Sequence, residues 1–329
     1  MMSVNDQELS ELVDGFNKSD RQALAKAITL VESTRTIDLA LKEKLLARIS
    51  KPEKMAIRMA ISGPPGVGKS TFINALGAIL LKQKYHVAIL PIDPSSTVSK
   101  GSVLADKTRM KDLLSSDHVF IRPSPSRGAL GGIALHTRDV MALVEAFGFD
   151  VVIIETVGVG QSEVMAESLA DHFILLFQPG SGDQLQAMKM GILEYADFIL
   201  VNKFDGEHRP LVEKTISSLN LLKTDAAEQG PMVFGISSIT GHGLEGFFKE
   251  LQKRHEQLIK NGALLKMRQE KSERFLGFSF HELLKSRIME LKWVRERYQD
   301  IIRQSTIDEN HMSSMLNQLV EEICQRLEP

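Results

Sequence analysis

The chain has 329 residues, of which 43% are hydrophobic and 25% charged, and its formal net charge at pH 7 is −2. A chain of this length can form one large α/β core with an appendage, or two domains, and its near-neutral charge gives no electrostatic reason to expect nucleic acid or an anionic membrane as a partner. Cys324 is the single cysteine, so no intrachain disulfide is possible. No apolar run is long enough to cross a bilayer, and no secretory signal is recognised at the start of the sequence. We therefore expect a cytoplasmic protein.

Residues 1–54 are predicted to be helical. The first helix has apolar residues at positions i, i+3, i+4 and i+7, the spacing of a buried stripe: Leu9, Leu12, Val13 and Phe16. Ser19 followed three residues later by Gln22 resembles a capping box, so we expect Ser19 to open a second helix. The apolar face of that second helix comprises Leu24, Ile28 and Val31.

Between residues 55 and 262, short β-branched runs alternate with segments of helical spacing. Seven runs are predicted to be strands: 56–62, 86–92, 118–122, 150–155, 172–178, 197–202 and 231–236. This alternation predicts an α/β fold with a mostly parallel, doubly wound sheet. Residues 263–329 show no convincing strand pattern and no proline before Pro329, so long helices are expected there. The predicted parts are therefore an N-terminal helical segment (1–54), an α/β domain (55–262) and a C-terminal helical segment (263–329).

A phosphate-binding loop lies between the first predicted strand and the helix expected at 71–81. It reads G-x-x-x-x-G-K-S and comprises Gly63, Pro64, Pro65, Gly66, Val67, Gly68, Lys69 and Ser70, with Thr71 following. In such a loop the backbone N–H groups point at phosphate oxygens, the lysine reaches the β- and γ-phosphates, and the serine hydroxyl can bind Mg²⁺. The alternative is a glycine-rich turn with an exposed lysine. The flanking strand and helix favour a P-loop NTPase, because a helix N-terminus attracts anions.

A second motif indicates which nucleotide is bound. Asn202, Lys203, Phe204 and Asp205 follow a predicted buried strand and form the N-K-x-D pattern of guanine-specific proteins. The Asp205 carboxylate can accept two hydrogen bonds from the guanine N1–H and exocyclic amine, which adenine cannot supply. Such charge-assisted bonds contribute about 1.5–3 kcal/mol each. The alternative is a solvated polar turn after a strand.

The rest of the guanine site is predicted from the same two loops. Lys203 is expected along the face of the base, and Asn202 is expected to tie this loop to the phosphate loop. The residues Ser237, Ser238 and Ile239, after the last predicted strand, fit the backbone loop that supports the guanine O6. The alternative for these three residues is an ordinary turn.

Two further strand ends are predicted to complete the catalytic site and a magnesium site. Glu155 ends a buried strand and is followed by Gly158, whose N–H can sense a γ-phosphate. Asp93 follows another predicted strand, and the alternative for it is an ordinary Asp-Pro turn. Asp106 is a candidate for a loop that approaches the γ-phosphate. The simpler interpretation of Asp106 is a helix N-terminus with a solvated charge. With Ser70, the predicted metal-facing set is Ser70, Asp93, Asp106 and Glu155. The predicted catalytic set is Lys69, Asp106, Glu155 and Gly158.

The interval between the phosphate loop and Glu155 narrows the class of P-loop protein. About 85 residues separate Lys69 from Glu155, which leaves room for two extra strand–helix units. Small Ras-like proteins place these elements closer together. The spacing therefore favours the signal-recognition/MinD-like branch, which includes metal and cofactor chaperones whose members often act as dimers.

Several strings together resemble the MeaB/ArgK family, the GTPases associated with methylmalonyl-CoA mutase. They are the phosphate loop through Thr71, Asp93–Ser96, Gly101–Ser102 with Asp106–Met110, Gly131–Gly132, Glu155–Glu163, Gly182–Asp183 with Leu185, Gln186 and Lys189, and Asn202–Asp205. The resemblance implies a GTP-binding and GTP-hydrolysing chaperone, with GTP/GDP and Mg²⁺ as cofactors. Its partner would be an adenosylcobalamin-dependent acyl-CoA mutase of the methylmalonyl-CoA mutase type, whose cofactor loading and protection it would gate.

The resemblance also implies two structural features. One is a homodimer formed through the C-terminal helical arm. The other is a third switch loop at 181–189, in which Asp183, Gln186 and Lys189 would couple nucleotide state to the mutase. We expect hydrolysis to be slow in the isolated chain, with the partner completing the site, and to depend mostly on positioning and charge stabilisation, with Gln161 as the candidate water-orienting residue.

Two alternative functions stay open at this point. A GTPase that delivers a metal such as nickel would predict a histidine-rich tract or a Cys/His cluster, whereas this chain has nine scattered histidines and one cysteine. A transport-linked (lysine/arginine/ornithine) ATPase or kinase is the second alternative. It is disfavoured because Asn202–Asp205 favours guanine and no acceptor site is evident.

Overall fold

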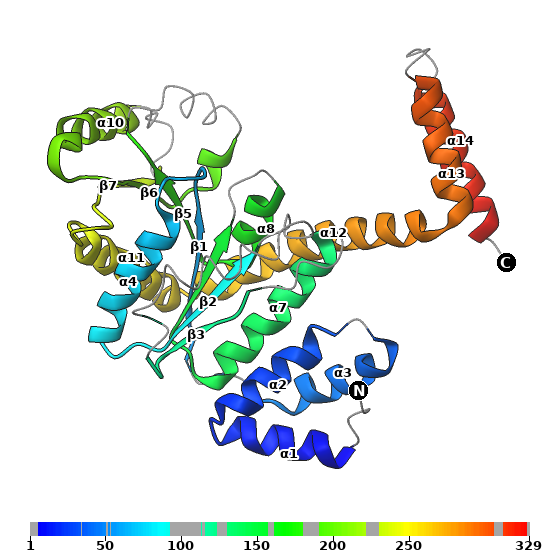
Figure 1. Cartoon of the computed structure of the whole chain (residues 1–329), viewed down its shortest axis with the longest axis horizontal. Coiled ribbons are helices and arrows are strands. Elements are labelled where there is room, and N and C mark those ends of the chain that lie inside the picture. The colour runs from blue at the N-terminus through cyan, green and yellow to red at the C-terminus, as the bar shows by residue number, and fades with distance from the viewer. Residues whose placement is uncertain are drawn as a thin grey trace.

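A parallel β-sheet forms the centre of the molecule (Figure 1). The computed structural model describes residues 6–33, 35–50, 52, 54–92, 113, 116–123, 130–156, 161–179, 191–221, 230–305 and 312–327. Within this part of the chain the sheet has seven strands in the order β3-β2-β4-β1-β5-β6-β7, and every neighbouring pair is parallel. The strands are β1 (Ile57–Ser62), β2 (Val87–Ile92), β3 (Val119–Ile121), β4 (Val151–Thr156), β5 (His172–Phe177), β6 (Phe198–Val201) and β7 (Met232–Gly235). All seven predicted strands are confirmed, within two residues at each end.

The central strands are apolar on both faces because helices cover both faces of the sheet. Every residue of β4 and β5 is buried. Alternate residues enter different cores: Val152 and Ile154 belong to one apolar cluster, and Val151 and Ile153 to the other. This alternation follows from the two-residue period of a strand, and it is what a doubly wound sheet requires.

Helices cover both faces of the sheet. The helices α4 (Lys69–Lys82) and α11 (Leu244–Lys260) supply the core on one face. The helices α7 (Leu130–Phe147), α8 (Gln161–Leu169) and α10 (Arg209–Leu221) supply the core on the other. Two short 3₁₀ helices, η2 (Ile192–Tyr195) and η3 (Gly206–His208), connect the later strands. The predicted P-loop α/β fold is thereby confirmed, including the helix that follows the phosphate loop.

Three N-terminal helices pack beside α7 (Figure 1). They are α1 (Asp6–Asn17), α2 (Arg21–Val31) and α3 (Thr36–Arg48). The predicted apolar stripe of α1 is buried at Leu9, Val13 and Phe16, while Leu12 is partly buried. The Phe16 ring contacts Phe147 of α7 edge-on, with 5.3 Å between ring centroids.

The predicted capping box at Ser19 is wrong by one residue. Asp20 is the N-cap of α2, and its side chain accepts a hydrogen bond from Gln22 N at 2.9 Å. Asp20 has the extended backbone that an N-cap needs, whereas Ser19 has a left-handed backbone with φ of 61°. Ser19 therefore ends the preceding turn rather than opening the helix.

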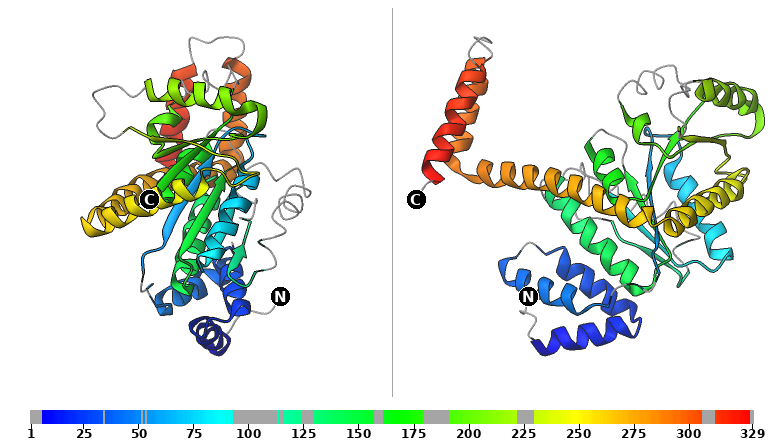
Figure 2. Two further views of the ribbon diagram at one scale, coloured as in Figure 1. Left: turned by 90° about the vertical axis from the view of Figure 1, so that its left-hand side faces the viewer. Right: turned by 180° about the vertical axis from the view of Figure 1, so that it is seen from behind.

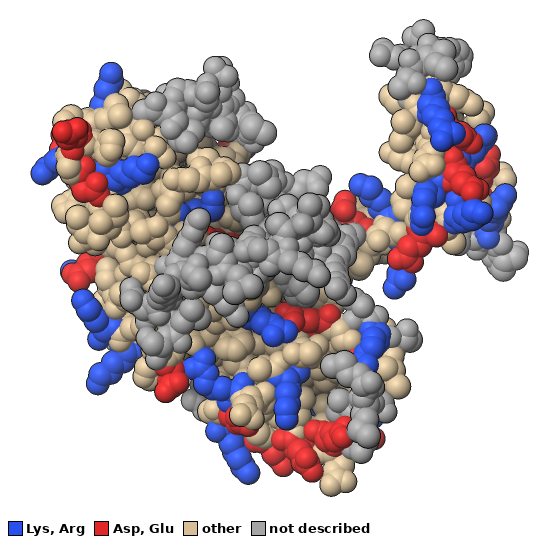
Figure 3. Space-filling model, viewed as in Figure 1, with Lys and Arg blue, Asp and Glu red and all other residues tan. Residues whose placement is uncertain are grey.

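The C-terminal segment forms an arm that extends from the body. It comprises α12 (Ala263–Glu290), α13 (Lys292–Ser305) and α14 (Met312–Leu327). The first half of α12 lies against α7 and α8, its second half projects away, and α13 and α14 pack side by side at its far end (Figures 1 and 2). Val294, Ile301 and Leu319 form a small core of their own between α13 and α14. Acidic and basic side chains are interspersed on the visible face of this hairpin (Figure 3).

Among the described helices, none is both long and apolar enough to cross a membrane.

Candidate functional site

The predicted site residues meet at the carboxyl edge of the sheet, because all the strands that carry them are parallel. The phosphate loop follows β1, Glu155 lies near the end of β4, and Asn202 follows β6. The pairing register places Glu155 directly beside Ile61, one residue before the end of β1. Residues from three separated stretches of the chain are thus brought to one edge.

Glycine is required in the phosphate loop for two physical reasons. Gly63, Gly66 and Gly68 all have positive φ, at 147°, 80° and 98°. A Cβ on Gly63 would lie 2.5 Å from the carbonyl oxygen of Leu176, and a Cβ on Gly68 would lie 2.8 Å from Asn202 Nδ2. The loop therefore combines left-handed backbone with close approach to its neighbours. Pro65 and Gly66 at its tip are exposed, whereas Val67 is fully buried.

Lys69 opens α4 and folds back over the loop. Its Nζ donates hydrogen bonds to the carbonyl oxygens of Gly63 at 2.6 Å and of Pro64 at 3.2 Å. Burial lowers the pKa of the Lys69 ammonium, and the negative charges of Glu155 and Glu163 oppose that effect. An anion bound at the loop would raise the pKa of Lys69, as these two carboxylates do.

Ser70 and Glu155 form an oxygen pair beside the loop. Ser70 Oγ donates to Glu155 Oε1 at 3.0 Å, and the Glu155 side chain is largely buried. A hydroxyl and a carboxylate are the hard oxygen donors that Mg²⁺ prefers. In the part of the chain that the structure describes, no group of three acidic, histidine or cysteine side chains could hold a metal by itself. These residues therefore fit Mg²⁺ of the usual nucleotide-associated kind, which is bound by few protein groups together with phosphates and water.

A further carboxylate at the site had no role assigned from the sequence. Ser62 Oγ, at the end of β1, donates to Glu163 Oε1 at 2.7 Å. Glu163 lies on α8 and is one of the two acidic groups that act on Lys69. The sequence contained the residue within the Glu155–Glu163 string, but its contact with β1 depends on where α8 packs.

Asn202 connects the two halves of the predicted nucleotide site. Its Nδ2 donates to the Val67 carbonyl oxygen at 2.9 Å. Its Oδ1 accepts hydrogen bonds from Ser238 N at 3.1 Å and Ser238 Oγ at 2.9 Å. The amide thus links the phosphate loop, the N-K-x-D loop and the loop after β7, and all of its contacts are buried.

Ser237 holds the carboxylate of Asp205. Its hydroxyl donates to Asp205 Oδ2, and its oxygen accepts a hydrogen bond from Thr240 N at 3.1 Å. Because the Thr240 N–H occupies a lone pair of the hydroxyl oxygen, the hydroxyl proton is directed at the carboxylate. The carboxylate is oriented before any base arrives.

The neighbouring residues complete the base side of the site. Lys203 has a left-handed backbone with φ of 67°, and Phe204 N donates to the Ile236 carbonyl oxygen at 2.8 Å. Ile239 is 82% exposed, and Thr71 on α4 is also exposed. The loop after β7 is thus anchored at Ser237 and Ser238 and open to solvent at Ile239.

Six of the predicted residues lie outside the described part of the chain: Asp93, Asp106, Gly158, Asp183, Gln186 and Lys189. Gln161 is the first residue of α8.

The geometry can bind a nucleoside triphosphate and stabilise charge on its phosphates. A cationic side chain, backbone N–H groups at a helix N-terminus and an Mg²⁺-compatible oxygen pair lie at one end of the site. An oriented carboxylate suited to a purine with adjacent N–H donors lies at the other end. Asn202 joins the two ends.

Comparison with known proteins shows close relatives over most of the chain. A model of the family described as methylmalonyl-CoA mutase-associated GTPase MeaB matches residues 24–292. A probable GTPase of Mycobacterium tuberculosis is 44% identical over 261 residues, covering 78% of this chain and 77% of that protein. The GTPase ArgK of Escherichia coli is 40% identical over 277 residues, covering 83% of this chain and 84% of that protein.

A mammalian relative and a solved structure extend the comparison. The mitochondrial methylmalonic aciduria type A homolog of Mus musculus is 39% identical over 275 residues, covering 79% of this chain and 66% of that protein. The crystal structure of an LAO/AO transport system kinase aligns with a TM-score of 0.76 at 31% identity, covering 97% of this chain and 99% of that one.

Proposed function

The chain belongs to the family of methylmalonyl-CoA mutase-associated GTPases (MeaB), as its motifs predicted, and from that membership we propose that its GTPase activity serves a cofactor chaperone. In this proposal, binding and hydrolysis of GTP gate the loading and protection of adenosylcobalamin on an acyl-CoA mutase of the methylmalonyl-CoA mutase type. The single cysteine supports a reducing compartment such as the cytoplasm as its location.

The bridge from Asn202 to Val67 is the observation that carries the GTP site. It joins the N-K-x-D loop, in which Asp205 would select guanine, to the loop that would hold the phosphates. A guanine nucleotide satisfies both ends at once. ATP leaves the oriented, partly buried Asp205 carboxylate without its two donors, which disfavours ATP by about 1–3 kcal/mol per missing bond.

Each residue at the phosphate end has a defined task in this proposal. Lys69 leaves the Gly63 and Pro64 carbonyl oxygens and neutralises charge on the β- and γ-phosphates. Ser70 and Glu155, with Asp93 and Asp106, would hold Mg²⁺, which supplies charge neutralisation on the phosphate oxygens when bound. The Gly158 N–H senses the γ-phosphate. Hydrolysis is then a matter of positioning and charge stabilisation, without a covalent intermediate.

We assign two further sets of residues to partners. Asp183, Gln186 and Lys189 couple nucleotide state to the mutase. The projecting half of α12 carries large apolar side chains that face solvent in the single chain, among them Leu276, Phe280 and Leu284. They recur every four residues and so lie along one side of the helix, as a helix–helix interface requires, and we assign this stripe to a homodimer contact.

A cofactor-transfer assay tests the proposed function. The purified chain is mixed with a methylmalonyl-CoA mutase apoenzyme and adenosylcobalamin, and mutase activation is followed with GTP, with a non-hydrolysable GTP analogue and with ATP. We expect GTP alone to support full, repeated activation. Equal activation with ATP, or the absence of any complex with the mutase in a pull-down with the analogue, would contradict the proposal.

A transport-linked kinase is the second candidate, because the aligned solved structure is described as an LAO/AO transport system kinase. Its direct test is turnover of ATP against GTP in the presence of arginine or ornithine. Phosphate transfer to a protein acceptor with ATP would favour this candidate, whereas preference for GTP without an acceptor would favour the chaperone.

A further inference from the structure

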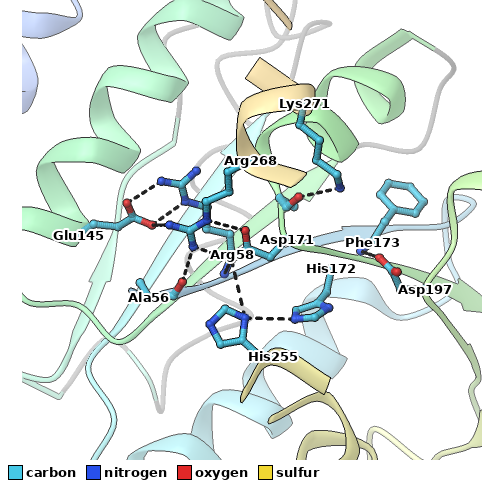
Figure 4. Close-up of polar contacts among 11 residues, drawn as sticks. Ala56, Arg58, Glu145, Asp171, His172, Phe173, Asp197, His255, Arg268 and Lys271 are labelled. Atoms are coloured by element: carbon cyan, nitrogen blue, oxygen red, sulfur yellow. Dashed lines mark hydrogen bonds and ion pairs between the residues drawn. The ribbon is translucent and has the colours of Figure 1, made fainter. Parts of the chain in front are cut away.

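The root of the arm is fixed to the core by two cationic side chains of α12, of which Lys271 is buried and Arg268 is partly exposed. Arg268 donates to both carboxylate oxygens of Asp171, at 2.7 and 2.6 Å, and to the Ala56 carbonyl oxygen at 2.7 Å. Lys271 Nζ lies 2.8 Å from Glu167 Oε1, and it donates to the carbonyl oxygens of Glu167 at 3.2 Å and Ala170 at 2.8 Å. Figure 4 shows Arg268 and Lys271 reaching from α12 toward this part of the core.

These contacts concentrate on the carboxyl end of α8. Glu167 belongs to the last turn of α8, and Ala170 and Asp171 connect α8 to β5. An ammonium group at a helix C-terminus binds carbonyl oxygens that have no partner within the helix and interacts favourably with the helix dipole. Lys271 is only 7% exposed, so these three acceptors, rather than water, stabilise its ammonium group. Lys271 therefore caps α8 from the arm.

The amino end of the same helix contacts the GTPase site. Glu163, in the first turn of α8, accepts the hydrogen bond from Ser62, the residue directly before Gly63. Glu163 also acts electrostatically on Lys69. One helix of nine residues, about 13 Å long, thus separates the arm contact from the phosphate loop.

The apolar packing of α8 does not by itself fix where the helix lies along its own axis, so the contacts at its two ends set that position. Met165, Ala166 and Leu169 are buried against the sheet. Such packing is non-directional and holds the helix on the sheet without fixing its register as strictly as directed hydrogen bonds and ion pairs do. A shift of α8 at Lys271 would consequently move Glu163 relative to Ser62 and Lys69.

We propose that Lys271 is a positioning residue of the GTPase site, which acts through α8 to hold Glu163 in its hydrogen bond with Ser62 and near Lys69. This inference rests on the GTP site of the proposed function and needs no mutase. It gives the arm a direct route to the nucleotide. Any partner or second copy that shifts α12 changes GTP turnover through Lys271.

A double-mutant cycle in the 329-residue chain tests the proposal. The variants are Lys271→Met, Glu163→Gln and the two combined, and kcat and KM for GTP are measured with saturating Mg²⁺. We expect each single variant to lower kcat by about 3- to 30-fold, with a smaller change in KM. The double variant should be no slower than the slower single variant, because both substitutions release the same helix.

Two controls separate positioning from general damage to the arm. Lys266→Met removes an exposed lysine of the same helix that pairs with Glu270 and should leave kcat unchanged. Lys271→Arg keeps the cation and should restore most of the lost kcat. If Lys271→Met melts well below the wild type, Glu167→Gln replaces it in the cycle, because it weakens the same ion pair while keeping the side-chain shape.

The outcomes that would overturn the proposal are distinct. Wild-type kcat in Lys271→Met, or losses that multiply in the double variant, would show that Lys271 does not act through Glu163. Those results would leave the proposed function intact. A wild-type chain that neither binds nor hydrolyses GTP would instead overturn the proposed function and this inference together.

Discussion

Asn202 and Val67 lie 135 positions apart in the chain, yet the Asn202 side-chain amide donates to the Val67 carbonyl oxygen at 2.9 Å. Asn202 follows β6 and Val67 lies in the phosphate loop after β1, both at the carboxyl edge of the sheet, where β5 separates these two strands. Their contact turns two separate sequence motifs into one site.

Asn202→Ala should weaken GTP binding about 10- to 100-fold. The substitution leaves the buried Val67 carbonyl oxygen and the Ser238 N–H and hydroxyl without their partner, at a cost of about 1–3 kcal/mol for a buried polar group. Fluorescent GTP titration measures the affinity. Asn220→Ala, at an exposed position of α10, is the matched control and should bind as the wild type does.

Asp205→Asn should reduce GTP affinity by a factor on the order of 10²–10⁴ and raise the relative affinity for xanthosine triphosphate. An amide N–H donor suits the carbonyl at C2 of xanthine and opposes the amine of guanine, while Ser237 can still donate to the amide oxygen. Competition among GTP, ATP and the xanthine nucleotide provides the measurement. An unchanged preference for GTP would mean that Asp205 does not contact the base.

Ser70→Ala should raise the Mg²⁺ concentration needed for half-maximal hydrolysis by about 10-fold, with less effect on GDP binding in the absence of metal. The reason is the loss of the hydroxyl that lies 3.0 Å from Glu155. Ser218→Ala, on α10, has a hydroxyl that donates to the Lys214 carbonyl oxygen and serves as the control. Equal Mg²⁺ dependence in both variants would remove Ser70 from the metal site.

The buried His172 should make the fold sensitive to acid. Burial lowers the pKa of His172 from 6.5 to about 3, with the charges of His255, Arg254 and Lys271 lowering it further and Asp171 opposing them. The unfolded chain therefore binds a proton at this residue between about pH 6.5 and 3, while the folded chain does not. Stability must fall as pH decreases through that window, by about 2 kcal/mol at pH 5.

Denaturant unfolding between pH 8 and pH 5 measures this loss. His172→Gln keeps a polar atom toward His255 and removes the titration, so it should lose about 2 kcal/mol less than the wild type over that range. His255, whose pKa burial also lowers, contributes with the same sign in both proteins. His208→Gln at an exposed position is the control, and an identical pH profile for all three proteins would contradict the prediction.

Phe280→Glu should convert the proposed dimer to monomers at micromolar concentration. Phe280 is 63% exposed in the single chain, and a symmetric interface would bring two glutamates into an apolar contact. Sedimentation velocity gives the mass in solution. Leu39→Glu, on α3 at 49% exposure, should keep the wild-type mass. A monomeric wild type would contradict the proposed dimer.

The sequence predicted those parts of the fold that depend on local residue patterns. The seven strands were predictable because each is a short run of apolar residues, whether it is buried on both faces, as β4 and β5 are, or is the shorter β3 at the edge of the sheet. The helix cap at Asp20 was not predicted, because Ser19 and Asp20 are both suitable caps and the backbone conformation of the turn chooses between them.

By itself, the sequence determined the phosphate loop and the N-K-x-D motif, since a tight turn, a reaching cation and a base-selecting carboxylate need particular residues at fixed spacing. The tertiary structure alone decided that Asn202 joins these motifs, that Ser237 orients Asp205, and that Lys271 of the arm and Glu163 beside Lys69 hold opposite ends of α8. The physical reason is that strand order and helix packing bring together residues about 30 to 135 positions apart, and no local pattern specifies those contacts.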